Sequence, residues 1–369
     1  MNDKNKQIVQ GRVIETNKSQ VLLDKKDQRI ILELFKNARS PISQIAKKVK
    51  LSKQVVDYRI KRMEQQNLIL GYTAFLNNMA MGYEMYIAKF RLKKISKEKL
   101  EEITNFFVNH PFTKWVATCT GQWDVSIVFI AKDIFHYNTL IQEFNFKLSE
   151  NLVKFRVDRF IEENVLGFDY LFKNLLNKNE NRTDDINKSK ANSNNKIENK
   201  IKNKNNNGAY TKIIKLDDID KQILQILETN ARTPLIKIAK QVNLSADAVN
   251  YRIKNLIKKR IIVKFIPKIN VSLLHYQWYV ISLYTQTSSE NEFAKLMSFL
   301  KSQSNIVFII RCPSIWNIEF DIHVKSSKDL FNLLMDLRTN FSEIIENIES
   351  TLVFYDHKYT HLPKGILNE

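Results

Sequence analysis

The chain contains an internal repeat. Residues 23–70 align without gaps to residues 216–263, and roughly 20 of the aligned pairs are identical. A constant offset of 193 residues carries Asp27 onto Asp220, and it continues weakly past the aligned block. Solenoid repeats are much shorter, at roughly 20 to 50 residues, so this period predicts a duplicated multi-domain unit.

The segment between the two copies, 173–212, has the composition of a linker. It holds 13 Asn and 10 Lys or Arg, few apolar residues and no periodicity. Such a segment buries too little apolar surface to offset the entropy of ordering itself. We expect a flexible linker here and a flexible tail over 1–20. A coil of this length lets the two copies pack side by side as an intramolecular pseudo-dimer.

The charge balance favours a polyanionic partner. Lys and Arg number 58 against 39 acidic residues, which gives a net charge of +19. Basic side chains displace the counterions condensed on phosphate backbones, and this displacement drives binding. A membrane surface or RNA would satisfy the same charge, and a Lys- and Asn-rich composition also follows from genome base bias. Charge alone therefore leaves the partner open.

Several function classes have little support in the sequence. No window of 18 apolar residues exists and the N-terminus has no apolar leader, so we expect a cytoplasmic protein with no membrane segment. Two Cys and seven Gly leave no Cys-rich zinc site, disulfide framework or Gly-rich phosphate loop. His357 and His361 are four residues apart, but we place them in a frayed C-terminal end. We expect no metal and no cofactor.

Each copy opens with three predicted helices. In copy one, apolar residues at helical spacing predict helices over 22–36, 42–49 and 52–66. The second helix follows a Ser-Pro pair in copy one and a Thr-Pro pair in copy two, so a capping residue precedes a proline at the first helical position. Ser52 and Ser245 provide the caps of the third helices. Apolar extended stretches over 68–76 and 261–269 follow, as a wing or a connecting strand.

The third helix of each copy has the chemistry of a DNA recognition helix. Val56, Ile60 and Met63 fall at i, i+4 and i+7 and should face the core. The opposite face carries hydrogen-bonding and basic side chains, which suit base edges and flanking phosphates in a major groove. A merely solvated helix face is the alternative, but the same pattern occurs twice in a basic chain. The predicted DNA-contacting residues are Lys53, Gln54, Asp57, Tyr58, Lys61 and Arg62 in copy one and Asp247, Asn250, Tyr251, Lys254 and Asn255 in copy two, where Ala246 replaces Lys53.

These segments resemble the DNA-binding domain of the leucine-responsive regulatory protein/AsnC family. Both copies carry Leu-Asp-x-x-Asp-x-x-Ile, then Ala-Arg, Ile-Ala, Leu-Ser and Tyr-Arg-Ile-Lys, then an apolar strand. The resemblance implies a sequence-specific transcription regulator that binds double-stranded DNA and forms dimers and higher oligomers. Arg59 and Arg252 match the family's recognition-helix arginine, and two roles stay open for them. They contact DNA, or they form a structural ion pair with the first helix.

Alternating strand and helix signals follow each helix-turn-helix. In copy one they predict strands over 85–92, 113–120, 123–131 and 153–160 and helices over 97–109 and 134–150. In copy two they predict strands over 278–285, 306–312, 316–324 and 348–355 and helices over 290–301 and 328–341. The order βαββαβ predicts a ferredoxin-like sandwich, so the fold class is α+β, with a winged helix-turn-helix plus ferredoxin-like pair duplicated in tandem. The sheet face that the helices leave open is most simply covered by the sheet of the other copy.

The predicted domain boundaries follow from these elements. They are a tail over 1–20, helix-turn-helix domains over 21–76 and 213–270, ferredoxin-like effector and dimerisation domains over 77–172 and 271–369, and the linker over 173–212. Cys119 and Cys312 fall on predicted strands, where we expect them to be small buried apolar residues.

The family resemblance also extends to the second domain, whose family counterpart dimerises through its sheet and binds small effectors. The match centres on Thr120-Gly121-Gln122-Trp123-Asp124, which resembles the family's Gly-x-Tyr/Trp-Asp segment. Gly121 permits a turn with positive φ. Asp124 binds the ammonium of an amino-acid effector, or it caps a plain hairpin. Copy two has Ser314-Ile315-Trp316-Asn317 instead, which puts effector binding by copy two in doubt, so the predicted effector residues are Thr120, Gly121, Trp123 and Asp124.

Two other function classes stay open beside a regulator that is not an enzyme. Siroheme decarboxylases resemble this architecture and have a Tyr-Asn-Leu-Trp-Phe-like segment and a His-x-x-Tyr-Asn setting. The matching segments here read Gln-Trp-Asp-Val-Ser-Ile and Ile-Trp-Asn-Ile-Glu-Phe, without that setting. The other class is an interaction scaffold that has lost DNA binding. Salt-dependent DNA affinity separates a regulator from a scaffold, and turnover of a haem precursor separates it from the enzyme.

Overall fold

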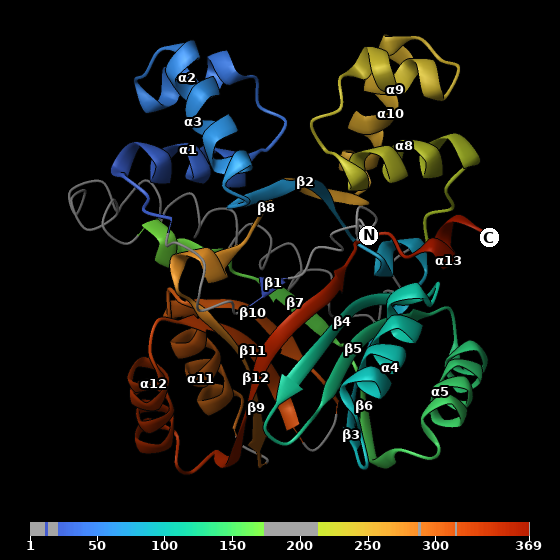
Figure 1. Cartoon of the computed structure of the whole chain (residues 1–369), viewed down its shortest axis with the longest axis vertical. Helices are drawn as coiled ribbons and strands as arrows, with labels where there is room; N and C mark the ends of the chain where they lie inside the picture. The colour runs from blue at the N-terminus through green and yellow to red at the C-terminus, as the bar shows by residue number, and fades with distance from the viewer. Residues whose placement is uncertain (1–11, 14–20, 173–212, 287–288, 314–315, 369) are drawn as a thin grey trace, which may run out of the picture.

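The computed structural model describes residues 12–13, 21–172, 213–286, 289–313 and 316–368. The predicted linker and most of the predicted tail lie outside these residues. Two helix-turn-helix units lie side by side at one end of the molecule, and two units of sheet and helix lie at the other (Figure 1). A two-stranded ribbon separates the two ends. In the described ranges, every helix is too short or too polar to span a bilayer.

The helix-turn-helix units confirm the predicted pattern of three helices. In copy one the helices are α1 (Lys25–Lys36), α2 (Ile42–Val49) and α3 (Lys53–Gln65), and in copy two they are α8 (Asp218–Thr229), α9 (Leu235–Gln241) and α10 (Ala246–Lys258). Helix α1 begins later than predicted, because the Asp24 carboxylate accepts hydrogen bonds from the backbone N–H groups of Lys26 and Asp27 and so caps the helix. Leu22 lies before this cap and is 78% exposed, so counting it in the apolar stripe was wrong.

The extended stretch after each third helix is a connecting strand. Strand β2 (Ile69–Leu76) pairs antiparallel with strand β8 (Ile262–Ile269), so the ribbon joins the two copies. Reciprocal contacts hold each helical unit to the ribbon strand of the other copy. The Ala38 N–H donates to the Phe265 carbonyl at 2.9 Å, and the Ala231 N–H donates to the Tyr72 carbonyl at 2.9 Å. Since each contact maps onto the other by the repeat offset, the copies are related by a pseudo-twofold axis.

Each copy also contains the predicted ferredoxin-like βαββαβ unit. The first unit comprises β3 (Glu84–Leu92), α4 (Lys97–Asn109), β4 (Thr113–Thr120), β5 (Val125–Ala131), α5 (Ile134–Leu148) and β6 (Leu152–Arg159). The second comprises β9 (Gln277–Thr285), α11 (Glu290–Ser302), β10 (Ile306–Arg311), β11 (Trp316–Val324), α12 (Ser327–Asn340) and β12 (Ile345–Tyr359). Short elements connect or end these units: β1 (Arg12–Val13), η1 (Met79–Met81), β7 (Glu162–Val165), η2 (Asp169–Phe172), η3 (Val271–Leu274) and α13 (Lys364–Leu367).

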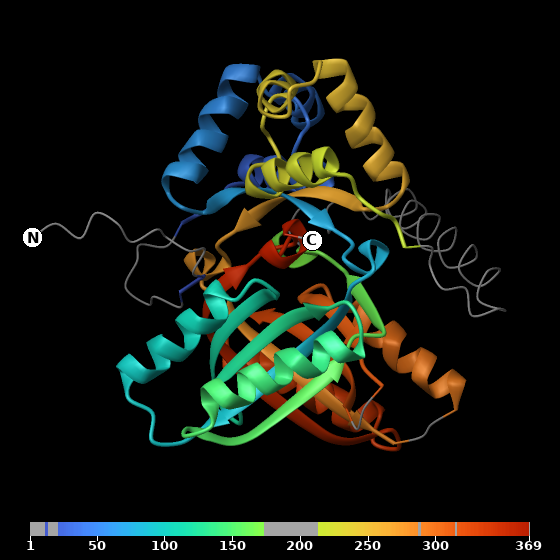
Figure 2. The same cartoon turned by 90° about the vertical axis from the view of Figure 1, so that its right-hand side faces the viewer.

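The sheets of the two units are joined edge to edge, because the last strand of each continues into the other. The strand order is β6-β3-β5-β4-β12-β9-β11-β10-β7. The first half of β12 pairs with β9 of its own copy, and the second half pairs with β4 of copy one. Strand β7, which follows β6, likewise pairs with β10 of copy two. The helices cover the outer faces of this sheet (Figure 2).

The long β12 corrects the expectation of a frayed C-terminal end. The strand was predicted over 348–355, but it runs to Tyr359 because its second half pairs with β4 of copy one. His361 is completely buried, and the His357 Nε2 lies 3.1 Å from the Thr118 hydroxyl. Burial lowers the pKa of His361 well below its usual value, so its imidazole is neutral. Residues Arg12–Val13 of the predicted tail also pair with β12.

A buried ion pair joins the inner faces of the two sheets. The Lys89 ammonium on β3 contacts the Glu319 carboxylate on β11, and both side chains are at least 96% buried. The Ser282 hydroxyl donates to the same carboxylate at 2.9 Å and accepts from Lys89 at 3.2 Å. Lys89 and Ser282 are one repeat apart, so this cluster lies at the pseudo-twofold axis. The prediction that each sheet covers the other is therefore confirmed.

We expect Glu319→Ala to lower the free energy of unfolding by about 3–5 kcal/mol, because it leaves the Lys89 ammonium buried without a counter-charge. The double variant Lys89→Met, Glu319→Leu should recover most of this loss, since it removes both charges and retains volume. Urea unfolding of the full chain measures both effects. A single variant as stable as the wild type would show that the ion pair contributes nothing to the pairing of the sheets.

Candidate nucleic-acid interface

The third helices present the predicted face to solvent. Val56, Ile60 and Met63 are buried against α1 and α2, as their spacing predicted. Ser52 caps α3 by accepting from the Val55 N–H, and Ser245 caps α10 in the same way. Tyr58 is 66% exposed, and its counterpart Tyr251 is 72% exposed.

All of the predicted contact residues are exposed or partly exposed. Lys53, Gln54 and Lys61 are exposed on α3, and Asp247 and Lys254 are exposed on α10. The Asp57 and Lys61 side chains form an ion pair at 2.8 Å along the same face, so part of this positive charge is already balanced. The partly exposed members are Asp57, Arg59, Arg62, Ala246, Asn250, Arg252 and Asn255.

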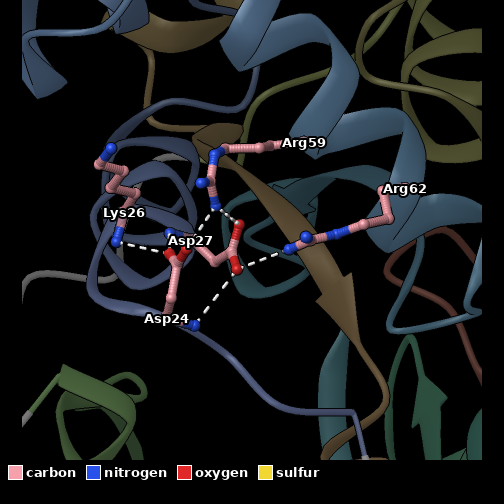
Figure 3. Close-up of polar contacts among 5 residues, drawn as sticks. All are labelled: Asp24, Lys26, Asp27, Arg59 and Arg62. Carbon is pink, nitrogen blue, oxygen red and sulfur yellow. Dashed lines mark hydrogen bonds and ion pairs between the residues drawn. The ribbon is translucent and has the colours of Figure 1, made fainter.

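Arg59 is held by the first helix. Its guanidinium lies 2.8 Å from an Asp24 oxygen and 2.8 Å from an Asp27 oxygen, while Arg62 reaches the second Asp27 oxygen at 2.6 Å (Figure 3). Arg59 is only 15% exposed at the side chain, and Asp27 is 1% exposed. Two roles were left open for this arginine, and in the structure it forms the ion pair with the start of α1. A DNA contact by Arg59 stays a prediction.

The ion pairs also set the protonation state of this cluster. Burial acts to raise the pKa of Asp24, but hydrogen bonds from the Asp27 N–H and from Arg59 outweigh it, so the pKa lies below its usual value. The hydrogen bond to Asp27, together with that to Asp24, raises the pKa of Arg59. Both shifts favour the charged forms of Asp24 and Arg59, and their ion pair fixes α3 on α1.

Copy two has a reduced version of the cluster. Arg252 lies 2.7 Å from Asp217 and 2.8 Å from Asp220, as the repeat predicts. The counterpart of Arg62 is Asn255, so the second arginine is missing. Asp220 has a more exposed side chain, at 14% against 1% for Asp27. The junction between first and third helix is thus more charged and more buried in copy one.

We expect Asp27→Ala to lower the free energy of unfolding by about 2–3 kcal/mol, because Arg59 and Arg62 both lose their partly buried counter-charge. The matched variant Asp220→Ala removes one partner from one arginine and should cost about 1 kcal/mol. Far-UV circular dichroism during urea unfolding compares the two. Equal losses would mean that Arg62 adds nothing to the cluster.

The hairpin predicted to bind an effector makes polar and ring contacts with the neighbouring strands β3 and β6. Gly121 has φ +118°, as a glycine turn requires. One oxygen of Asp124 accepts from the Leu92 N–H at 2.7 Å, and the other lies 3.2 Å from Arg91. Trp123 is 3% exposed, and Lys154 lies over its ring at 5.0 Å. Thr120 is exposed. The Asp124 carboxylate is thus occupied by the end of strand β3, and both roles kept open for it stay predictions.

The copy-two counterpart is only partly described. Ser314 and Ile315 lie outside the described residues, whereas Asn317 exchanges hydrogen bonds with the backbone of Thr285. Cys119 and Cys312 are free and buried, and burial raises the pKa of the Cys119 thiol to about 12, so it is an unreactive apolar residue as predicted. Among the residues that the structure describes, no group of three His, Cys, Asp or Glu side chains is placed to hold a metal ion.

Comparison with known proteins supports the interpretation of both helical units. Residues 216–257 match the model of an AsnC-type helix-turn-helix domain, and residues 23–69 match a winged helix-turn-helix DNA-binding domain. The proline dehydrogenase transcriptional activator of Rhodobacter capsulatus is 32% identical over 123 residues, which are 33% of this chain and 80% of that protein. The transcriptional regulator FL11 of Pyrococcus abyssi is 30% identical over 121 residues, 33% of this chain and 79% of that protein.

These matches agree with the duplication, because about a third of this chain aligns with about four fifths of each relative. Fold and interface together define a DNA-binding transcription regulator with two helix-turn-helix units. The chain belongs to the leucine-responsive regulatory protein/AsnC family.

A solved structure matches both copies at once. The siroheme decarboxylase NirDL superposes with a TM-score of 0.61 over 92% of this chain and 94% of its own, at 10% sequence identity. At this identity the likeness concerns the fold alone. The superposition shows that another chain has nearly the whole of this two-copy fold.

Proposed function

We propose that this chain is a sequence-specific transcription regulator that binds one operator with both of its helix-turn-helix units, in the cytoplasm and without enzymatic activity. The observation that carries the proposal is the placement of α3 and α10. Both lie at the same end of the molecule, and the β2–β8 ribbon joins them (Figure 1). One chain thus provides the pair of recognition helices that dimeric regulators assemble from two chains.

We expect the double variant Lys53→Ala, Lys61→Ala to weaken DNA binding and to reduce the slope of log K against log salt by about 1 to 2, because each lost phosphate contact removes roughly 0.9 from the slope. Both residues are exposed on α3, away from the ion-pair cluster. The charge-matched control is Lys93→Ala, Lys97→Ala, at exposed positions next to and within α4. Fluorescence anisotropy over a salt series measures both. Equal slopes for variant and control would refute the interface.

The two recognition helices differ where they meet bases. Asp57 is replaced by Asn250, and Arg62 by Asn255. An Asn side chain pairs bidentately with adenine, whereas a carboxylate accepts from the cytosine amino group. Charge differs too, since residues 23–70 hold 12 basic and 5 acidic residues, a net of +7, and residues 216–263 hold 9 and 5, a net of +4. The two half-sites of the operator should therefore be unlike, and copy one should bind nonspecific DNA more strongly.

Selection of binding sites from random DNA tests the asymmetry. We expect two unlike half-sites with a fixed spacing, because the ribbon holds the two helices in one arrangement. In a second selection with Asn250→Asp, the copy-two half-site should shift toward the copy-one half-site while the other stays unchanged. A palindromic consensus for the wild type would mean that identical copies from two chains pair on the DNA.

The other function classes become outcomes of these experiments. A scaffold would show no salt-dependent affinity for any duplex. A siroheme decarboxylase would turn over a haem precursor, and the support for it is the overall likeness to NirDL. A small effector and assembly into higher oligomers remain part of the proposed regulation. The support for both is family membership, because the predicted effector hairpin uses its polar groups internally.

A further inference from the structure

The segment after β12, residues 360–366, joins several parts of the molecule, and we call it the strap. Its backbone is bonded to the first ferredoxin-like unit. The Thr360 N–H donates to the Lys114 carbonyl at 2.9 Å, and the Gly365 N–H donates to the Pro111 carbonyl at 2.9 Å. In Figures 1 and 2, the strap and α13 lie between this unit and helix α8 of copy two.

The strap holds α8 through one carboxylate. The Glu228 carboxylate on α8 accepts from the Thr360 hydroxyl at 2.8 Å and from the His361 N–H at 3.3 Å. On the other side, the side-chain amide of Asn78, which follows β2 of copy one, donates to the His361 carbonyl at 3.0 Å. The backbone of His361 therefore links the helical unit of copy two to copy one, in addition to the contacts of the ribbon.

The imidazole of His361 occupies an apolar site. It is completely buried, and its ring centroid lies 4.3 Å from that of Phe75 on the ribbon and 4.8 Å from that of Tyr359 on β12. Within the described part of the chain, neither ring nitrogen has a hydrogen-bond partner. A protonated imidazole has two N–H donors and a charge, and leaving all of these buried and unpaired is costly. The site therefore accepts the neutral ring only.

The charges that face the ring favour the neutral form as well. Burial lowers the pKa of His361 well below its usual value, and the ammonium groups of Lys114 on β4 and Lys268 on β8 lower it further. The charged group from α8 is Glu228, which is engaged by the strap backbone, and the titratable neighbour from β12 is Tyr359. Outside its site, the imidazole takes up a proton with an ordinary pKa of about 6.5. Acidification therefore favours release of the ring.

Copy one is apolar at the equivalent positions. The repeat offset carries His361 onto Phe168 and Glu228 onto Phe35. These two phenylalanine rings stack with their centroids 4.8 Å apart. The helical unit of copy one is thus attached through a contact that protons do not affect, whereas that of copy two is attached through a carboxylate and a buried imidazole.

We propose that the strap is a pH-sensitive attachment of the copy-two helical unit. At acidic pH, the His361 ring takes up a proton and leaves its site, the strap detaches, and α8 loses its bonds from Thr360 and His361. The copy-one unit keeps its attachment, so acid acts on one of the two recognition helices. The consequence for DNA binding rests on the proposed function, whereas the release of the strap does not.

Hydrogen exchange of the full chain without DNA tests the release, with mass spectrometry as the readout and correction for the intrinsic pH dependence of exchange. We expect the opening of residues 360–366 and 218–229 to increase about tenfold from pH 7.5 to pH 5.5, since only the released state gains a proton near pH 6.5. Residues 25–36 are the internal reference from copy one and should change much less. Equal changes in α1 and α8, or no change in the strap, would overturn the proposal.

The decisive variant is His361→Phe, which introduces the copy-one residue and removes the titrating group. The pH dependence of exchange in the strap and α8 should then fall to that of residues 25–36. Burial also lowers the pKa values of His110 and His357, so a general response to acid remains in this variant as the baseline.

The matched control is His275→Asn, at an exposed position with φ 60°, a conformation that Asn tolerates. It should behave as the wild type. His361→Leu has a smaller side chain and replaces the Phe variant if the phenyl ring disturbs folding. The full tenfold change in a folded variant of either kind would refute the role of His361.

Selection of binding sites from random DNA at pH 7.5 and pH 5.5 tests the consequence for DNA. We expect the copy-two half-site to lose its base preference at pH 5.5, while the copy-one half-site keeps its own. Equal loss at both half-sites, or at neither, would overturn this step. A chain that selects no DNA at either pH would refute the proposed function, and hydrogen exchange would still decide whether the strap is released.

Discussion

The two copies pair about one pseudo-twofold axis, and this pairing positions both the sheets and the helical units. Near the helical units, β2 of copy one pairs with β8 of copy two across this axis. Between the sheets, the Lys89–Glu319 ion pair joins the two inner faces. Neither copy is complete alone, because each last strand continues into the sheet of the other. The position of α3 relative to α10 is therefore set by the ribbon strand that follows each helix and by the pairing of the sheets beyond it.

The buried ion pair also explains why copy one pairs with copy two. Lys89 and Glu319 occupy positions that are serine in the opposite copy, Ser282 and Ser126. Pairing of two identical first copies would bring two buried lysines together at the axis, and pairing of two second copies would bury glutamates without a cation. Both alternatives leave uncompensated charge in a low-dielectric interior, which costs several kcal/mol. The ion pair contributes specificity for the mixed pair, whatever it adds to stability.

The sequence predicted the local structure well and the contacts between copies less completely. Helix α4 and strand β4 begin and end at the predicted residues, because their apolar periodicity and caps are local signals. The extension of β12 to Tyr359 was missed, since its second half pairs with a strand more than 200 residues earlier.

The two copies agree at positions that hold the helical units together and differ at other positions. Positions that hold the helical units together stay paired, as Arg39 and Arg232 do, each donating to a backbone carbonyl of the other copy. Positions on the exposed face of the third helix and in the strands near the axis have diverged, as Lys53 against Ala246 and Lys114 against Val307 show. Two identical chains cannot vary the two halves of one site independently, whereas a duplicated chain can. Covalent linkage thus retains the symmetric framework of a dimer and allows its two halves to differ in sequence.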